Sequence, residues 1–183
     1  MLSDKEKAAS WAKCLLEQLD WVILDTETTG LAYNDEIVQV AILGHDGETL
    51  MDTLVRPTQP ISPESTALHG ITDADVMGAP LFPEVFAHIQ EVVAGKTVVI
   101  YNAAFDLRLI RQSLAKYQGS NIGIEEEQAE CAMLWYSAWV GESWPQGGYK
   151  WQKLVGGDHT ALGDCRATYR VIERMAESCK EEL

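Results

Sequence analysis

Cysteine is scarce in this chain, and long apolar runs are absent from it. The four cysteines, Cys14, Cys131, Cys165 and Cys179, are scattered over 183 residues and include no Cys-x-x-Cys pair. Such spacing indicates neither a disulfide framework nor a zinc site. No apolar run approaches the roughly 20 residues that a membrane-spanning helix needs, and the polar N-terminus is unlike a signal peptide. We therefore expect a cytoplasmic protein that does not act at a membrane.

Basic residues are also few. The chain has 14 Lys and Arg against 28 Asp and Glu, which gives a net charge of -14. This balance argues against a protein that grips duplex DNA through a wide basic face, because that affinity depends on neutralising phosphates. It does not exclude an enzyme that holds a few nucleotides at a metal centre, where some of the acids would be metal ligands.

The length of 183 residues and the apolar content of 46% suit one domain with a substantial core. Residues 1–20 contain an amphipathic helix with Ser3 as the expected N-cap, and we expect this helix to pack on the domain. Contact with a partner protein is the less common alternative. Residues 21–183 form a single domain in this prediction.

The pattern of apolar residues and turns predicts a mixed sheet. An apolar strand over 21–24 precedes two further strands over 36–43 and 49–55, and their short spacing indicates an antiparallel meander. Later elements are helices over 64–68, from 72, over 82–93, 105–117 and 160–177, and a strand over 96–101. Residues 118–158 are the least regular part. Three meander strands followed by helix, strand and helix predict an α/β or α+β domain.

Two carboxylates follow the first apolar strand. Asp25 and Glu27 are two residues apart, so a strand of period two projects them from the same face. Like charges this close repel each other, and burying them without compensation is costly. A divalent metal held by oxygen ligands is the simplest compensation. The alternative is a strand that enters a polar loop with both acids in water.

Two other stretches carry acids at predicted helix starts. Asp106 ends Asn102-Ala-Ala-Phe-Asp106, and Asp164 ends His159-Thr-Ala-Leu-Gly-Asp164. Each stretch alone has an ordinary explanation, because a carboxylate is favourable in the first turn of a helix. His159 alone is most simply a solvated or capping residue.

Together the three stretches resemble the DEDDh (DnaQ-like) 3′–5′ exonuclease family, which includes the proofreading epsilon subunit of bacterial DNA polymerase III. The first motif stands here as Asp25-Thr-Glu27-Thr-Thr-Gly, and the stretches around Asp106 and Asp164 match the second and third. The resemblance covers residues 20–178. It implies an α/β, ribonuclease H-like fold, in which a mixed sheet (an antiparallel meander plus parallel strands) is flanked by α-helices.

The resemblance also implies a catalytic set. Asp25, Glu27, Asp106 and Asp164 would hold two divalent ions, Mg²⁺ or Mn²⁺, with Asp25 shared between them. Carboxylates suit these ions, and two ions about 3.5–4 Å apart can activate water and stabilise the charge of phosphodiester cleavage. His159 would be the general base, so replacing it with alanine should remove most turnover and keep metal binding.

Substrate contacts follow from the same resemblance. Thr28 and Leu31 would approach the terminal nucleotide, with Leu31 against its base and Phe105 nearby. His69, in a segment that also looks like the family's, would lie near the site, although a structural role at the start of a loop fits it equally well.

Tryptophans gather before His159, at Trp135, Trp139, Trp144 and Trp151. We expect them to fill the core and the lid of this region, because buried aromatics dominate core packing. Base stacking is the alternative. Nearby lysines, Lys150 and Lys153, would form either a small basic strip for phosphates or ordinary surface ion pairs.

The leading functional prediction is a metal-dependent 3′–5′ exonuclease that releases nucleoside 5′-monophosphates from single-stranded 3′ ends, with DNA slightly favoured. The alternatives are an exoribonuclease that trims RNA ends, and a proofreading or trimming subunit active mainly within a polymerase or DNA-processing complex. A homodimer stays open as well, because no interface can be identified in the sequence.

Overall fold

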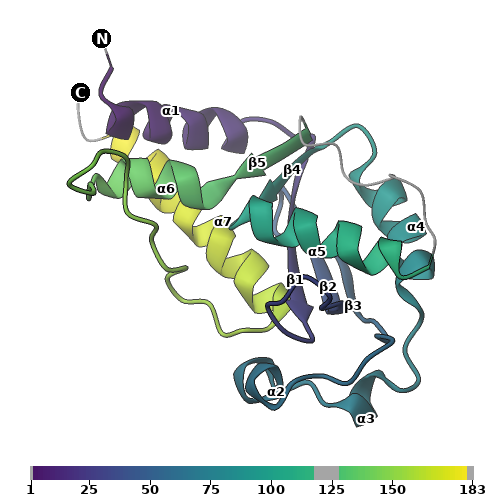
Figure 1. Cartoon of the computed structure of the whole chain (residues 1–183). Coiled ribbons are helices and arrows are strands. Elements are labelled where there is room, and N and C mark those ends of the chain that lie inside the picture. Colours follow the sequence, from purple (N-terminus) through teal and green to yellow (C-terminus); the bar gives the residue numbers. More distant parts are fainter. Residues whose placement is uncertain (1, 118–127, 181–183) are drawn as a thin grey trace.

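A five-stranded sheet in the order β3-β2-β1-β4-β5 forms the centre of the molecule (Figure 1). The computed structural model describes residues 2–117 and 128–180. Strand β1 pairs antiparallel with β2, and β2 with β3, whereas β4 is parallel to β1 and β5 to β4. The strands are β1 Trp21–Thr28, β2 Ile37–Gly44, β3 Thr49–Leu54, β4 Thr97–Ile100 and β5 Ala129–Cys131. The predicted mixed sheet, with its meander, is confirmed.

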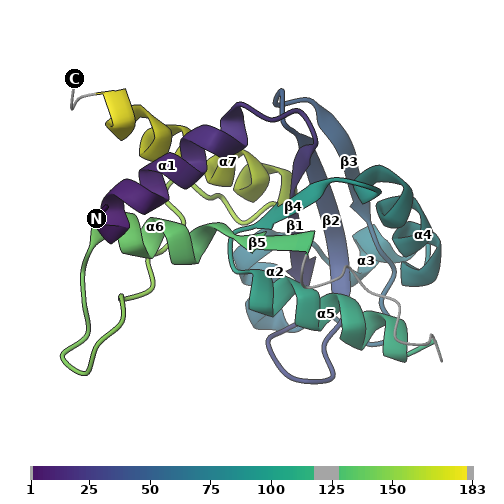
Figure 2. The ribbon, with the colours of Figure 1, turned by 90° about the horizontal axis from the view of Figure 1, so that it is seen from above.

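Helices cover both faces of this sheet (Figures 1 and 2). The described helices are α1 Asp4–Leu16, α2 Pro63–His69, α3 Asp73–Val76, α4 Phe82–Val93, α5 Ala103–Ala115, α6 Ala132–Val140, α7 Ala161–Glu177 and η2 Ser178–Lys180. Alternating residues of β1 serve two cores: Val22 and Leu24 pack with α4 and α5. Trp21 and Ile23 pack with α1, α6 and α7. The central strand is therefore buried on both sides.

Helix α1 has a capped N-terminus and packs on neighbouring helices. Ser3 and Glu6 form a reciprocal capping box, which satisfies backbone N–H groups at the helix N-terminus. Ala8, Ala12 and Leu15 are buried in the same core as α6 and α7. Among the described residues, no helix is both long enough and apolar enough to cross a membrane.

The structure adds detail to two local expectations. Strand β1 continues past Leu24 to Thr28, so the first two acids belong to the strand itself. The stretch 118–158, predicted to be the least regular part, contains β5 and α6, while residues 118–127 lie outside the described part. Helix α6 is apolar around most of its circumference because it packs against α1 and α7, and it therefore lacks the two-faced pattern of a surface helix.

Candidate active site

Three acids converge where β1 meets the start of α7. Asp25 and Glu27 project from the same face of β1, and Asp164 lies in the first turn of α7. Carboxylate oxygens of the three all lie within 4.8 Å of one another. The period of the strand and the position of the helix start together produce a cluster that could hold a cation.

Asp106 reaches the same end of β1 from the other side of the sheet. It lies in the first turn of α5 and is buried. Thr26, which alternates with the two acids of β1, donates its hydroxyl to Asp106 Oδ1 at 2.7 Å. This hydrogen bond fixes the carboxylate against the strand. Thr26 is not among the predicted site residues, although its place between two same-face acids assigns it to the opposite face.

All four acids line one cavity of about 420 Å³. His159 and Phe105 line it too, so the structure brings six of the nine predicted site residues together. Side chains not predicted for the site complete the wall; they are Thr26, Tyr101, Asn102, Lys153 and Leu154.

Burial and mutual repulsion raise the pKa of three of these carboxyls. Burial is the main cause for each: it raises the pKa of Glu27 to about 8 and that of Asp106 to about 7. The pKa of Asp25 is raised well above its usual range by burial and then by the charges of Asp106, Asp164 and Glu27. None of the four acids forms an ion pair with a described Lys or Arg. A set of oxygen ligands that repel one another in this way fits a divalent cation.

His159 lies on the exposed loop that leads into α7. Its backbone has φ 60°, the left-handed region that most residues avoid but His, Asn and Asp enter more often. Asp164 Oδ1 accepts hydrogen bonds from the backbone N–H groups of Asp158, at 2.9 Å, and His159, at 3.2 Å. The loop is thus tied to the acid beside it, while the imidazole stays open to water.

A second cavity of about 290 Å³ adjoins the first and shares Thr26, Glu27 and Phe105 with it. The remaining predicted substrate contacts, Thr28, Leu31 and His69, line this second cavity. The two cavities therefore meet at Glu27.

Two of these residues differ in how freely they can meet a ligand. Leu31 is 77% exposed, so its side chain is available. His69 is buried: Ile71 N–H donates to its Nδ1 at 3.1 Å, and its Nε2 lies 3.1 Å from the carbonyl oxygen of Thr28. Because Nδ1 accepts, Nε2 carries the proton and donates to Thr28. Both ring nitrogens thus hold the backbone that forms the cavity wall.

A fixed loop presents Leu31. Asp35 accepts from the Thr29 hydroxyl at 3.0 Å and from the backbone N–H of Ala32 at 2.6 Å. Arg108, on α5, donates to the carbonyl oxygen of Ala32 at 3.3 Å, and its guanidinium lies over the ring of Phe105. These contacts join the loop to the helix that carries Asp106.

The four tryptophans before His159 divide into two pairs. Trp135 and Trp139 are half-buried: Trp135 stacks on Trp11 at 5.2 Å, and Trp139 packs on Tyr136. Trp144 is 47% exposed and Trp151 is 73% exposed. The expectation of core and lid packing holds for the first pair and is wrong for the second.

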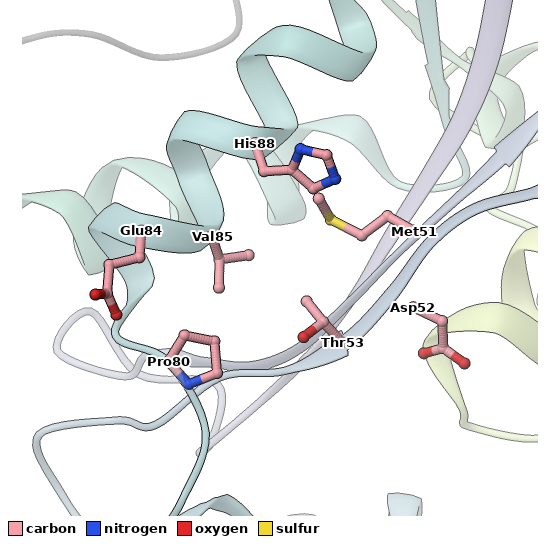
Figure 3. Close-up of a pocket in the computed structure, with 7 residues that line it drawn as sticks. All are labelled: Met51, Asp52, Thr53, Pro80, Glu84, Val85 and His88. Atoms are coloured by element: carbon pink, nitrogen blue, oxygen red, sulfur yellow. The ribbon is translucent and has the colours of Figure 1, made fainter.

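A third cavity, of about 370 Å³, lies between β3 and α4 (Figure 3). Thr53, Val85, Glu84 and His88 are among its lining residues. None of the predicted site residues belongs to it, so this cavity is separate from the acids.

Residues 22–172 match the RNase_T family of exonucleases, a span that includes the four acids and His159. The chain belongs to this family. The "Uncharacterized exonuclease CP81" of Escherichia phage 186 is 40% identical over 180 residues, covering 91% of this chain and 92% of that protein. A "DNA polymerase III subunit epsilon-like protein" of Rhodobacter capsulatus is 42% identical over 108 residues, but these cover 55% of this chain and only 15% of that protein.

Solved structures of similar fold are also exonucleases. Exonuclease X in complex with 5′-overhanging duplex DNA has a TM-score of 0.59 at 29% identity, over 87% of this chain and 93% of that one. The nuclease domain of 3′hExo, a DEDDh family member bound to rAMP, has a TM-score of 0.61 at 16% identity, over 87% and 92%. The second likeness shows the fold alone. The prediction of a DEDDh exonuclease with a ribonuclease H-like fold is confirmed, and the protein is a hydrolase of nucleic acids.

Proposed function

We propose that this protein is a metal-dependent 3′–5′ exonuclease that releases nucleoside 5′-monophosphates from single-stranded 3′ ends in the cytoplasm. The observation that supports this most is the group of four acids, from β1, α5 and α7, in one cavity with His159. Two divalent ions, Mg²⁺ or Mn²⁺, would supply an activated water and stabilise charge on the attacking and leaving oxygens. The protein's side chains would hold these ions, take the proton and position the substrate.

In this proposal Asp25 would be the shared ligand, because it lies in one cavity with the three other acids. Glu27 and Asp164 would hold one ion with it, since the three carboxylates lie within 4.8 Å of one another. Asp164 Oδ1 accepts from two backbone N–H groups, which would leave Oδ2 for the ion. Asp106, held by Thr26, would serve the second ion directly or through water.

His159 takes the proton from the attacking water. Its exposed imidazole can exchange that proton with solvent, which a buried base could not do as readily. Leu31, on the fixed loop, packs against the terminal base, with Thr28 and Phe105 near the terminal nucleotide. His69 is bonded to the backbone through both nitrogens, so we assign it to holding the wall of this subsite.

The choice between DNA and RNA is a finer proposal, with DNA slightly favoured. The solved neighbours include exonuclease X with duplex DNA and 3′hExo with rAMP, so they support both substrates. A role within a polymerase or DNA-processing complex is supported by relatives named as DNA polymerase III subunits. Self-association into a homodimer is a separate proposal, which sedimentation of the purified chain would test.

A time course on matched 5′-labelled single-stranded DNA and RNA tests these proposals, with Mg²⁺, Mn²⁺ or EDTA and with Asp25→Ala as the control. A metal-dependent ladder of single-nucleotide steps, absent in the variant, is the expected result, and the faster ladder identifies the substrate. Internal cuts, or a ladder that persists in EDTA, would contradict the mechanism. Cleavage of neither strand by the wild type would favour the partner-dependent role.

A further inference from the structure

The segment from Trp151 to Val155 leads from an exposed turn to the wall of the acidic cavity. Just before it, Ser143 and Tyr149 form an isolated antiparallel bridge. The Tyr149 hydroxyl donates to Asp4 at the start of α1, which fixes that turn at the α1 end of the molecule. Figure 1 shows the chain descending from there to the start of α7.

Exposure alternates along this segment. Trp151, Lys153 and Val155 are exposed, whereas Gln152 and Leu154 are half-buried. Trp151 and Lys153, two residues apart, are thus both open to solvent. The residues between and after them hold the segment to the body of the protein: the Tyr101 hydroxyl donates to the carbonyl oxygen of Gln152 at 2.9 Å, and Leu154 packs into the core with α7.

Lys153 is the exposed residue of this segment that reaches the acidic cavity. Its side chain lines the cavity together with Asp25 and Asp106. Within the described part of the chain, Lys153 forms no ion pair, although the protein carries a net charge of -14. Trp151, two residues before it, is 73% exposed and stacks on no described ring. The segment thus carries an unpaired cation in the cavity wall and, two residues before it, an uncovered indole.

The position of the segment fixes which part of a substrate would meet it. If the terminal nucleotide occupies the cavity lined by Thr28 and Leu31, the scissile phosphate lies at the acids. The rest of the strand then leaves through the other cavity, whose wall includes Lys153.

We propose that Trp151 and Lys153 form a contact strip for the single strand on the 5′ side of the scissile bond. Trp151 stacks on an unpaired base, and Lys153 contacts a backbone phosphate. Aromatic stacking tolerates every base, and a phosphate contact reads no sequence, so the strip binds single strands without sequence preference. This inference rests on the proposed function for the direction of the strand. It gives an acidic enzyme a local means of holding a polyanion.

The kinetic test compares two substrates. Thymidine 5′-(p-nitrophenyl phosphate) presents the terminal nucleotide and a leaving group but no upstream strand, whereas dT12 presents both. Trp151→Ala should reduce kcat/KM for dT12 about tenfold more than for the nitrophenyl ester, as expected for one lost base–aromatic contact. In the wild type, KM should fall as the oligonucleotide lengthens from dT2 to dT6, and this dependence should flatten in Trp151→Ala. Equal losses on both substrates would indicate a structural role and overturn the proposal.

The matched control is Trp144→Ala. Trp144 is also exposed and also beside a lysine, with Lys150 Nζ 5.8 Å from its ring centroid, but it lies in the remote turn. This variant should behave like the wild type on dT12 and on the ester. A loss on dT12 equal to that of Trp151→Ala would show that the effect is not specific to Trp151, which contradicts the proposed strip.

Binding is measured separately from turnover, by fluorescence anisotropy of fluorescein-labelled dT12 with Ca²⁺ in place of Mg²⁺. Trp151→Ala should weaken binding about tenfold. Lys153→Gln should reduce the slope of log K against log[salt] by about 0.7, the value for one lost phosphate contact on a single strand. Unchanged binding in both variants overturns the strip whatever the catalytic result. If the wild type cleaves nothing but binds dT12 through Trp151, the strip stands and the proposed function fails.

Discussion

The two sides of the acidic cavity are built differently. On one side, Asp25, Glu27 and Asp106 belong to a central strand and to the first turn of a helix, within the buried part of the fold. On the other side, Lys153 and His159 belong to an exposed loop without regular secondary structure. The first side is fixed by the sheet and the second by a few hydrogen bonds.

The difference matches what the proposed function requires of each side. Acids that share a cation must stand close together out of water, which raises their pKa in the absence of the cation. A residue that exchanges protons with solvent, or holds a departing strand, has to stay exposed. The comparison predicts that changes to the buried side alter metal binding and stability together, whereas changes to the loop alter turnover and leave stability almost unchanged.

The largest effect is expected from Asp25→Asn, which keeps the shape of the side chain but removes a central ligand. Hydrolysis of oligonucleotides should fall by roughly 10³-fold or more. The metal-free variant should also be more stable than the wild type at pH 8, by about 1–2 kcal/mol or roughly 2–8 °C in Tm, because one of several repelling buried charges is gone. Glu48→Gln, at an exposed turn, is the control. Activity within tenfold of the wild type would contradict the shared-ligand role.

His159→Asn probes the exposed side. Asparagine tolerates the left-handed backbone at this position better than alanine, so the substitution removes the imidazole without straining the loop. We expect the single-turnover rate constant to fall roughly 10²–10⁴-fold, while the metal affinity and the Tm stay near wild-type values. His88→Asn, far from the acids, is the matched control. Near-normal single-turnover cleavage would exclude His159 as the general base.

Thr26→Val tests whether Asp106 has to be held. Valine keeps the shape of threonine but cannot donate the 2.7 Å hydrogen bond to Asp106. Loss of an outer partner of a metal ligand typically costs about 10–100-fold in metal affinity or activity. The Mn²⁺ concentration that gives half-maximal activity should therefore rise about tenfold. Thr26→Ser restores the hydroxyl and should restore the affinity; equal behaviour of the two variants would show that the hydrogen bond does not matter.

The smallest effect is the pH dependence of stability in EDTA. The pKa of Glu27 is raised from 4.5 to about 8 and that of Asp106 from 3.8 to about 7, so the folded state binds more protons than the unfolded state between these limits. Stability therefore falls as the pH rises from about 5 to 8. We expect Tm to drop by several degrees over this range and to recover at pH 8 when Mn²⁺ is added.

Glu27→Gln separates this effect from the general repulsion of an acidic chain. The variant keeps the other acids but loses the carboxyl whose pKa is raised to about 8, so its Tm should fall less steeply with pH. If Tm falls with pH as steeply as in the wild type, the buried acids do not cause the pH dependence.

Much of the fold was predictable, because local signals and the final structure agree. Alternation and short turns predicted the meander, and Ser3 marked the start of α1. The failures have physical causes. Helix α6 lies between other helices and carries no polar face. Trp144 and Trp151 are apolar residues that the loop leaves exposed, and no periodicity distinguishes them from the half-buried Trp135 and Trp139.

The residue types that the chemistry needs can be identified without a structure: acids two apart on a strand, acids at two helix starts, and a histidine ahead of the last helix. How these residues meet depends on long-range packing. Strand alternation assigns Thr26 to the α5 face, but the packing of α5 makes it the partner of Asp106. Likewise, Nε2 of His69 is bonded to the carbonyl oxygen of Thr28 because α2 ends against β1. Both contacts join residues far apart in the chain, and no local pattern records them.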